Sequence, residues 1–194
     1  AGEVVGIYGL MGAGRTELAM SIFGSSYGIG TSGTLKLRNE EVVLKSPKQA
    51  IAAGLAYVTE DRKGNGLVLT NSIKTNTTLA NLKAISKATF IDKDKEYEVA
   101  ADYASKLKTK TPSVEQLVGN LSGGNQQKVL LAKWMFADPD VLILDEPTRG
   151  IDVGAKYEIY CIINDLVAAG KSVIMISSEL PETIGMSDRI YVMN

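Results

Sequence analysis

Short apolar runs alternate with segments of helical spacing along most of this 194-residue chain. The first run, 4–8, leads through a glycine-rich loop into helical spacing over 16–23. Ser46, Pro47 and Gln49 have the spacing of a helix start, which predicts a short helix that ends before Gly54. Further strands are expected at 34–37, 41–44, 55–58, 141–144, 173–176 and 190–193, and further helices at 74–82, 93–108, from 123 to about 136, and at 155–167.

This alternation predicts an α/β fold with a mainly parallel, doubly wound sheet. Residues 70–118 differ, because helical periods with charged faces predominate there and no strong strand stands out. We therefore expect 1–69 and 119–194 to form the core and 70–118 to be an inserted helical subdomain. The chain starts without methionine and stops within a strand pattern, so we expect its N-terminal strands and its C-terminal end to be truncated.

The composition excludes several kinds of chemistry. No histidine is present, which excludes a Ser-His-Asp triad, an HExxH metalloprotease and imidazole acid–base catalysis. Cys161 is the only cysteine, so a disulfide framework and a multi-cysteine zinc site are excluded. With 21 basic and 22 acidic residues, the net charge of −1 gives no overall footprint for nucleic acid. No apolar run reaches the roughly 18 residues of a transmembrane helix.

The glycine-rich loop is the first candidate for chemistry. Gly9, Gly12 and Gly14 precede Arg15 and Thr16, and the spacing matches the phosphate-binding loop GxxxxG[K][ST], with arginine in place of lysine. Glycines allow successive backbone N–H groups to surround phosphate oxygens at a helix N-terminus, and Thr16 has the position of a Mg²⁺ ligand. A strand–turn–helix corner that carries glycines only for packing is the alternative.

The second candidate is an apolar strand that ends in two acids. After 141–144, Asp145 has the position to hold Mg²⁺ through water, and Glu146 has the position to polarise an attacking water. The alternative is a pair of solvated acids at a strand end.

The third candidate is the string LSGGNQQK at 121–128, which opens a helix. Ser122 is a candidate N-cap, and the two glycines after it allow a phosphate to approach the helix N-terminus. An ordinary capped helix is the alternative. The order and spacing of the three candidates favour a common function over coincidence.

LSGGNQQK resembles the signature motif of ABC-type ATPases, and VLILDEPT at 141–148 resembles their Walker B strand. The resemblance covers essentially the whole chain and implies a P-loop NTPase core. Several stretches are more narrowly similar to the second ATPase half of tandem ribose, galactose and xylose importers: GLMGAGRTE (9–17), YVTEDRKGNGLVL (57–69), VGNLSGGNQQK (118–128), PTRGIDVGAK (147–156) and SSELPE (177–182).

The resemblance implies that two such domains enclose ATP and Mg²⁺ head to tail. This domain's own nucleotide would contact the loop, and its metal would be held by the loop threonine, the Walker B aspartate and the residue at the Q-loop position. Its signature would face the partner's nucleotide, and Gly150, Ile151 and Asp152 resemble the family's D-loop. The implied nucleotide-binding residues are Gly9, Gly12, Ala13, Gly14, Arg15, Thr16, Glu17, Ser122, Gly123, Gly124, Asn125 and Asp152; the implied metal ligands are Thr16, Asp145 and Glu60; the implied catalytic residues are Glu146, Ser178 and Glu60.

Three substitutions depart from the family pattern. Arg15 replaces the loop lysine, and its planar fork does not reproduce a compact ammonium between phosphates. Glu60 replaces the Q-loop glutamine and adds a negative charge. Ser178 replaces the switch histidine and cannot carry a positive charge toward the γ-phosphate. We therefore expect a degenerate ATP site, with Glu146 still available to orient water, and an intact signature that completes the partner's site.

The resemblance also implies partners and a location. We expect a second ATPase domain in the same polypeptide, membrane permease subunits, an indirect link to a sugar-binding protein, and a place at the cytoplasmic face of the cell membrane. The family carries an adenine-stacking aromatic on a strand upstream of the loop, and this sequence begins after that position. We therefore expect weak ATP affinity for this chain alone. The alternative is a regulatory or structural dimerisation module without turnover.

Other features have simpler interpretations. Trp134 and Cys161 are expected to pack in the core. The charge clusters at 61–63 and 93–98 are expected to be solvated. The resemblance implies that 67–69 form a docking surface for the membrane domain.

Overall fold

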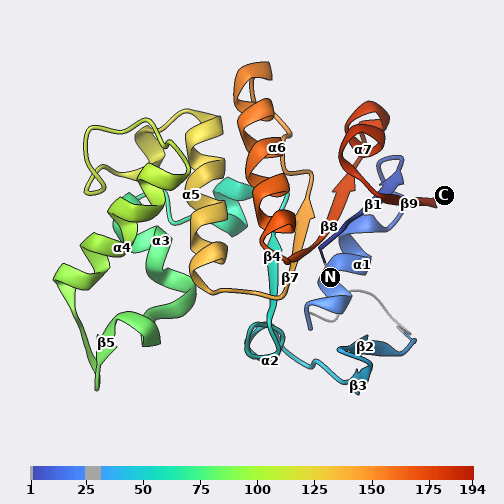
Figure 1. Ribbon diagram of the computed structural model, residues 1–194, viewed down its shortest axis with the longest axis horizontal. Helices are drawn as coiled ribbons and strands as arrows, with labels where there is room; N and C mark the ends of the chain where they lie inside the picture. The colour runs from blue at the N-terminus through green and yellow to red at the C-terminus, as the bar shows by residue number, and fades with distance from the viewer. Residues whose placement is uncertain (1, 25–31) are drawn as a thin grey trace.

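A five-stranded sheet forms the centre of the protein (Figure 1). The computed structural model describes residues 2–24 and 32–194, and the part of the glycine- and serine-rich stretch at 25–31 lies outside the described residues. All neighbouring strands of the sheet are parallel, which confirms the expected fold class. The order is β4-β7-β8-β1-β9, with β1 at Val4–Gly9, β4 at Leu55–Val58, β7 at Val141–Asp145, β8 at Ser172–Ser177 and β9 at Arg189–Met193.

Helices surround this sheet, and α3 and α4 lie to one side of it, beside α5 (Figure 1). The α-helices of the described residues are α1 (Arg15–Ile22), α2 (Pro47–Ala52), α3 (Ile73–Thr78), α4 (Lys93–Lys106), α5 (Gly123–Phe136), α6 (Val153–Ala168) and α7 (Leu180–Met186). Two antiparallel hairpins pair β2 (Leu35–Leu37) with β3 (Glu40–Val42) and β5 (Ser86–Lys87) with β6 (Phe90–Ile91). In residues 2–24 and 32–194, no helix has the length and apolar character to cross a membrane.

Polar side chains fix the starts of most of these helices. Ser46, Ser72, Asp92, Ser122 and Asp152 each accept a hydrogen bond from the backbone N–H three residues later. Each cap satisfies one of the N–H groups that a helix start leaves without an internal partner. The expected caps at Ser46 and Ser122 are confirmed, so the starts of α2 and α5 are encoded locally.

The single helix expected at 74–82 is wrong. Helix α3 ends at Thr78, and a 3₁₀-helical segment, Leu79–Ile85, continues with Asn81 in a non-helical conformation (φ −142°, ψ 53°). Asn81 Nδ2 donates to the carbonyl of Phe136 at 3.2 Å, so a tertiary contact with the end of α5 holds the break. The hairpin β5–β6 follows in a region where no strong strand was expected.

Helix α7 was also not expected, because its sequence is short and includes a proline. It packs closely on β1, where a Cβ on Gly6 would lie 2.8 Å from Thr183 Cγ2. The proline occupies the first turn, where no backbone donor is needed. Close approach to the sheet therefore favours a helix that periodicity alone does not reveal.

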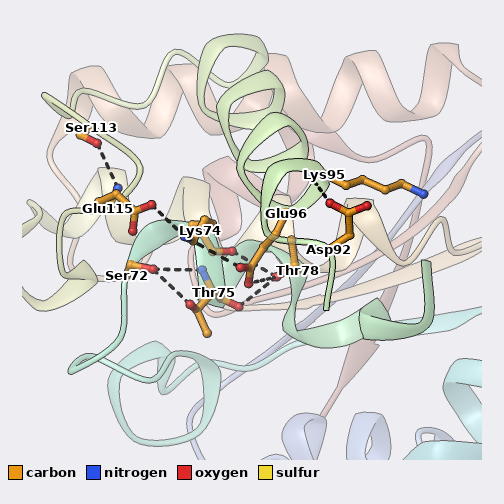
Figure 2. Close-up of polar contacts among 9 residues, drawn as sticks. All are labelled: Ser72, Lys74, Thr75, Thr78, Asp92, Lys95, Glu96, Ser113 and Glu115. Carbon is orange, nitrogen blue, oxygen red and sulfur yellow. Dashed lines mark hydrogen bonds and ion pairs between the residues drawn. The ribbon is translucent and has the colours of Figure 1, made fainter. Parts of the chain in front are cut away.

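Figure 2 shows a polar cluster that joins α3, α4 and the loop at 113–115. Lys74 Nζ lies 2.8 Å from Glu115 Oε1 and 3.9 Å from Glu96 Oε2, and Thr78 Oγ1 donates to Glu96 Oε1 at 3.2 Å. Glu96 is only 7% exposed. The expectation that 93–98 are solvated is therefore wrong at Glu96, because one turn of α4 directs this carboxylate toward α3.

The aromatic part of the core lies between the sheet and α5. The ring of Phe23 lies 5.7 Å from that of Tyr57 and 5.8 Å from that of Trp134, the latter at 90°. Trp134 is buried, as expected. Cys161 is exposed, which corrects its expected burial. On α6 the inward stripe consists of Ile159, Ile162 and Ile163, and the helical period turns Cys161 away from it.

Lys133 on α5 is buried without a carboxylate as its hydrogen-bond acceptor. Its Nζ donates to the carbonyl of Gly66 at 2.6 Å and lies 5.0 Å from the centre of the Trp134 ring. Burial lowers the pKa of Lys133 to about 8. The Gly66 carbonyl belongs to a π-helical turn, Arg62–Gly66, so Lys133 joins this turn to α5.

We expect this lysine to make stability rise with pH. An unfolded lysine titrates near 10.4, so between about pH 8 and pH 10.4 the unfolded chain binds more protons than the folded one. The free energy of unfolding should therefore increase by about 3 kcal/mol across this window. Urea unfolding at several pH values measures this increase.

Lys133→Met should remove the increase, and Lys48→Met on the exposed start of α2 should leave it intact. An identical pH dependence in the wild-type protein and Lys133→Met would contradict the assignment.

Candidate functional site

The candidate site lies at the carboxyl edge of the sheet. There β1 continues into the glycine loop and α1, β7 ends at Asp145, and the chain after β4 reaches Glu60. Because β4, β7, β8 and β1 are consecutive in the sheet, their parallel carboxyl ends lie next to one another. Segments far apart in the sequence therefore meet at one edge, where ligands bind in open α/β sheets.

Glycine conformations shape the loop between β1 and α1. Gly12 and Gly14 have φ values of +87° and +83°, which L side chains rarely adopt. A Cβ on Gly9 would lie 2.7 Å from the carbonyl oxygen of Met193, so glycine is also required at the start of the loop. The loop leads directly into α1, whose free N–H groups favour an anion.

A cleft of about 270 Å³ opens beside this loop. It brings together residues of the loop, the segment after β4 and the segment after β7. Its lining consists of Met11, Gly12, Gly14, Arg15, Thr16, Glu17, Glu60, Glu146 and Arg149. Gly9 and Ala13 belong to the loop, and Asp145 lies at the end of β7 and contacts Thr16. Met11 and Arg149 are lining residues that sequence reasoning missed.

Arg15 forms a buried ion pair with Glu146. Its Nη1 lies 2.9 Å from Glu146 Oε1, and the two side chains are 8% and 7% exposed. Glu146 has a positive φ of 48°, a strained conformation for a residue with a side chain. The carboxylate expected to be available for water is thus engaged by the arginine that replaces the loop lysine.

Asp145, one residue earlier, has different partners. Its Oδ2 accepts hydrogen bonds from Thr16 Oγ1 and from Tyr57 Oη, both at 2.8 Å. Its Oδ1 is buried and has no hydrogen-bond partner among the described residues. Burial raises the pKa of Asp145.

A carboxylate oxygen without a donor, beside a threonine hydroxyl, fits a hard cation such as Mg²⁺. Thr16 and Asp145 are therefore able to hold this ion. Sequence reasoning missed Tyr57, which lies on β4 and pairs in register with Ile143 of β7.

The second charged pair joins Glu60 to Arg149. The carboxylate that replaces the Q-loop glutamine therefore has a cationic partner within the same cleft. The negative charge expected from Glu60 is compensated by the segment that follows Pro147. Sequence spacing did not predict this pair, because Glu60 follows β4 and Arg149 follows β7. Only the folded sheet brings these two segments together.

Ser178 is half-buried in the segment after β8 and is not among the lining residues of the cleft. Its neighbour Ser177 donates to the buried carboxylate of Glu182, which also accepts from Thr148. This network fixes the end of β8 to the segment after β7. Ser178 is therefore placed at the correct edge of the sheet, outside the cleft wall.

The signature residues lie apart from this cleft. Asn125 Nδ2 donates to Ser122 Oγ at 2.9 Å, and Asn125 Oδ1 accepts from the backbone of Lys110. A Cβ on Gly124 would lie 2.6 Å from Ala155 Cβ, so this glycine lets α5 approach α6 closely. Gly123 lies beside the Gly150 carbonyl, and Asp152 caps α6. The signature and the segment 150–152 thus lie side by side.

The charge cluster at 61–63 is solvated only in part. Asp61 and Lys63 are exposed, but the half-buried Arg62 donates to the carbonyl of Arg149 at 2.9 Å. Within the expected docking surface, Leu67 is buried and Val68 is 41% exposed. The expectation is therefore wrong for Leu67, whose side chain belongs to the core.

Comparison with known proteins identifies the family. A family model described as "ABC transporter" matches residues 1–149. The chain belongs to the ABC transporter family. It is 61% identical over 193 residues to the L-arabinose transport ATP-binding protein AraG of Geobacillus stearothermophilus. It is 54% identical over 193 residues to the xylose import ATP-binding protein XylG of Thermoanaerobacter pseudethanolicus.

The chain is also 51% identical over 195 residues to the ribose import ATP-binding protein RbsA of Clostridium tetani. These alignments cover 100% of the chain but only 38% of each relative, so the chain spans little more than a third of their length.

Solved structures of this ABC family share the fold. A nucleotide-free ATP-binding cassette from an ABC transporter superposes with a TM-score of 0.83 at 22% identity, over 99% of this chain and 77% of that one. A dimeric cassette in a post-hydrolysis state with ADP and Pi gives 0.80 at 18% identity, over 100% and 82%. The expected ABC-type α/β architecture is confirmed.

The Arg15–Glu146 pair generates a stability prediction. Arg15→Met should lower the free energy of unfolding by about 3 kcal/mol, because it leaves a buried carboxylate without its cation. Adding Glu146→Gln should recover most of this loss, since the double variant removes both charges. Urea unfolding of both variants provides the measurement. Equal losses in the single and the double variant would show that the pair does not contribute in this way.

Proposed function

We propose that this chain is a nucleotide-binding domain of an ABC-type sugar importer and that it binds ATP with Mg²⁺. The names of its arabinose, xylose and ribose transport relatives support sugar import. The cleft beside the glycine loop supports nucleotide binding, because its lining combines an anion-favouring helix start with Thr16, whose hydroxyl donates to the buried Asp145. We further propose that the chain corresponds to the second ATPase half, with 1–69 and 119–194 as its core and 70–118 as its helical subdomain.

In this proposal the chain's own site binds ATP but hydrolyses it slowly. The backbone of the glycine loop holds the phosphates, and Thr16 and Asp145 hold Mg²⁺, which would neutralise phosphate charge. Glu146 is the residue that would orient the attacking water. The observation that carries the degeneracy is its buried ion pair with Arg15, since the same arginine takes the place of the lysine that would contact phosphate.

The signature supplies the other half of the proposed function. Ser122, Gly123 and Asn125 lie at the start of α5 near Asp152, none of them among the lining residues of the cleft, and the buried Gly124 packs against α6 behind them. We propose that the signature completes the nucleotide site of a second ATPase domain. Permease subunits would be the next partners, an extracytoplasmic sugar-binding protein would be linked through them, and the complex would lie at the cytoplasmic face of the membrane. Nucleic acid is not a proposed partner.

Replacing two of the substituted residues by the family's residues tests whether the ATP site is degenerate. Arg15→Lys releases Glu146, and Ser178→His restores a side chain able to carry positive charge toward phosphate. Together they should raise hydrolysis at this site by at least about tenfold, since one electrostatic donor is typically worth more than that. Site-resolved ATP hydrolysis in the full-length protein with its partner domain is the measurement.

Arg38→Lys and Ser105→His, both at exposed positions, are matched controls and should change nothing. Reverted variants with the hydrolysis rate of the wild-type protein would refute the degeneracy. If the partner domain also shows no hydrolysis that depends on Ser122, the chain is instead a regulatory or structural dimerisation module.

A further inference from the structure

Tyr57 contacts the candidate metal site from β4, a strand that supplies none of the expected site residues. Its hydroxyl donates to Asp145 Oδ2 at 2.8 Å, and the ring is half-buried beside the site. Asp145 Oδ2 also accepts from Thr16 at 2.8 Å. One carboxylate oxygen is therefore fixed by donors from two different elements, β4 and α1.

The sheet explains why Tyr57 reaches this oxygen. Tyr57 is in register with Ile143 of β7, and Asp145 lies two residues further on the same face. The tyrosine side chain leans along the strand toward the carboxyl edge and meets the aspartate there. Its position is thus set by strand pairing, a rigid part of the fold.

The Tyr57 ring is packed against other aromatic side chains of the core. The Phe23 ring at the end of α1 lies 5.7 Å from the Tyr57 ring, and Trp134 of α5 packs edge-on against Phe23 at 5.8 Å. Phe23 is 6% exposed and Trp134 9% exposed. A ring confined in this way presents its hydroxyl in one direction, as a positioning group requires.

The other carboxylate oxygen of Asp145, Oδ1, differs from Oδ2 in its hydrogen bonding. Oδ1 is buried and has no hydrogen-bond partner in the part of the chain that the structure describes, while Asp145 as a whole is 1% exposed. A buried carboxylate oxygen without a donor is costly unless a ligand or cation satisfies it. The two donors on Oδ2 set the rotation of the carboxylate that leaves Oδ1 in this state.

We infer that Tyr57 is a positioning residue for the magnesium site, which acts by fixing the orientation of the Asp145 carboxylate beside Thr16 through Oδ2, with Oδ1 left without a protein donor. The inference rests on the proposed function, because it requires that the site binds Mg²⁺ with nucleotide. Partners that orient metal ligands typically account for 10- to 100-fold in metal affinity. A tyrosine that only fills space would affect folding without affecting metal affinity.

Tyr57→Phe separates these two roles, because it removes the hydroxyl and keeps the ring that packs on Phe23. The experiment uses the full-length protein, a non-hydrolysable ATP analogue, and Mn²⁺ as the spectroscopic probe for the Mg²⁺ site. Electron paramagnetic resonance gives the Mn²⁺ affinity in the presence of the analogue. Binding of the analogue in EDTA and thermal unfolding are measured in parallel.

Tyr103→Phe is the matched control. Tyr103 also packs edge-on against a phenylalanine, at 6.2 Å from Phe136, but it lies on α4 outside the cleft. We expect Tyr57→Phe to weaken Mn²⁺ binding by about tenfold, with the metal-free binding of the analogue unchanged. Tyr103→Phe should match the wild-type protein in both measurements.

The outcomes distinguish the inference from the proposed function. Wild-type Mn²⁺ affinity in Tyr57→Phe overturns the inference alone. Equal losses of Mn²⁺ affinity and of metal-free binding assign Tyr57 a structural role and also overturn it. A wild-type protein that binds neither the analogue nor Mn²⁺ overturns the proposed function, and the inference with it.

Discussion

The parallel pairing of β4, β7, β8 and β1 is the constraint on which the candidate site depends. Parallel strands bring their carboxyl ends to one edge, so each contributes the residues that follow it. Tyr57, Asp145 and the glycine loop are far apart in the sequence, yet strand register places them within hydrogen-bonding distance. Any change that shifted this register would separate Thr16 from Asp145 and reshape the cleft that the loop lines.

Charge pairing is the second level of organisation. Arg15 and Glu60 depart from the family pattern, and each forms an ion pair. Arg15 pairs with Glu146, and Glu60 pairs with Arg149. The two pairs differ in physical weight. The first is buried, so its ions interact through a medium of low polarity, whereas the second is about half exposed and is screened by solvent. The first pair is therefore the one able to control what Glu146 does.

Much of the fold could be predicted because its signals are local. The run at 55–58 matches β4 residue for residue, β7 extends its predicted strand by only Asp145, and the serines before α2 and α5 are the expected caps. The glycine loop was found from spacing for the same reason, since turn geometry restricts which residues fit.

The parts that could not be predicted depend on contacts between distant segments. The break at Asn81 follows from a hydrogen bond to Phe136, and the Arg15–Glu146 pair joins residues that lie on different strands' extensions. Glu96 has a charged sequence neighbourhood but is buried because α3 supplies Lys74 and Thr78. In each case the partner was visible in the sequence, and only the register of the folded chain reveals the pairing.

Asp145 and Glu146 have different surroundings, and this difference is the physical basis of the proposed separation of nucleotide binding from hydrolysis. The residues are adjacent, but β7 ends at Asp145 and Glu146 has a left-handed backbone. Their side chains consequently have different partners: Asp145 accepts only neutral hydroxyl donors, which leave its negative charge for a cation, whereas Glu146 is paired with a guanidinium. A carboxylate paired with arginine is a weaker hydrogen-bond acceptor for water than a free one. In the proposed function, this arrangement keeps the carboxylate that would hold a metal and restrains the adjacent carboxylate that would orient water.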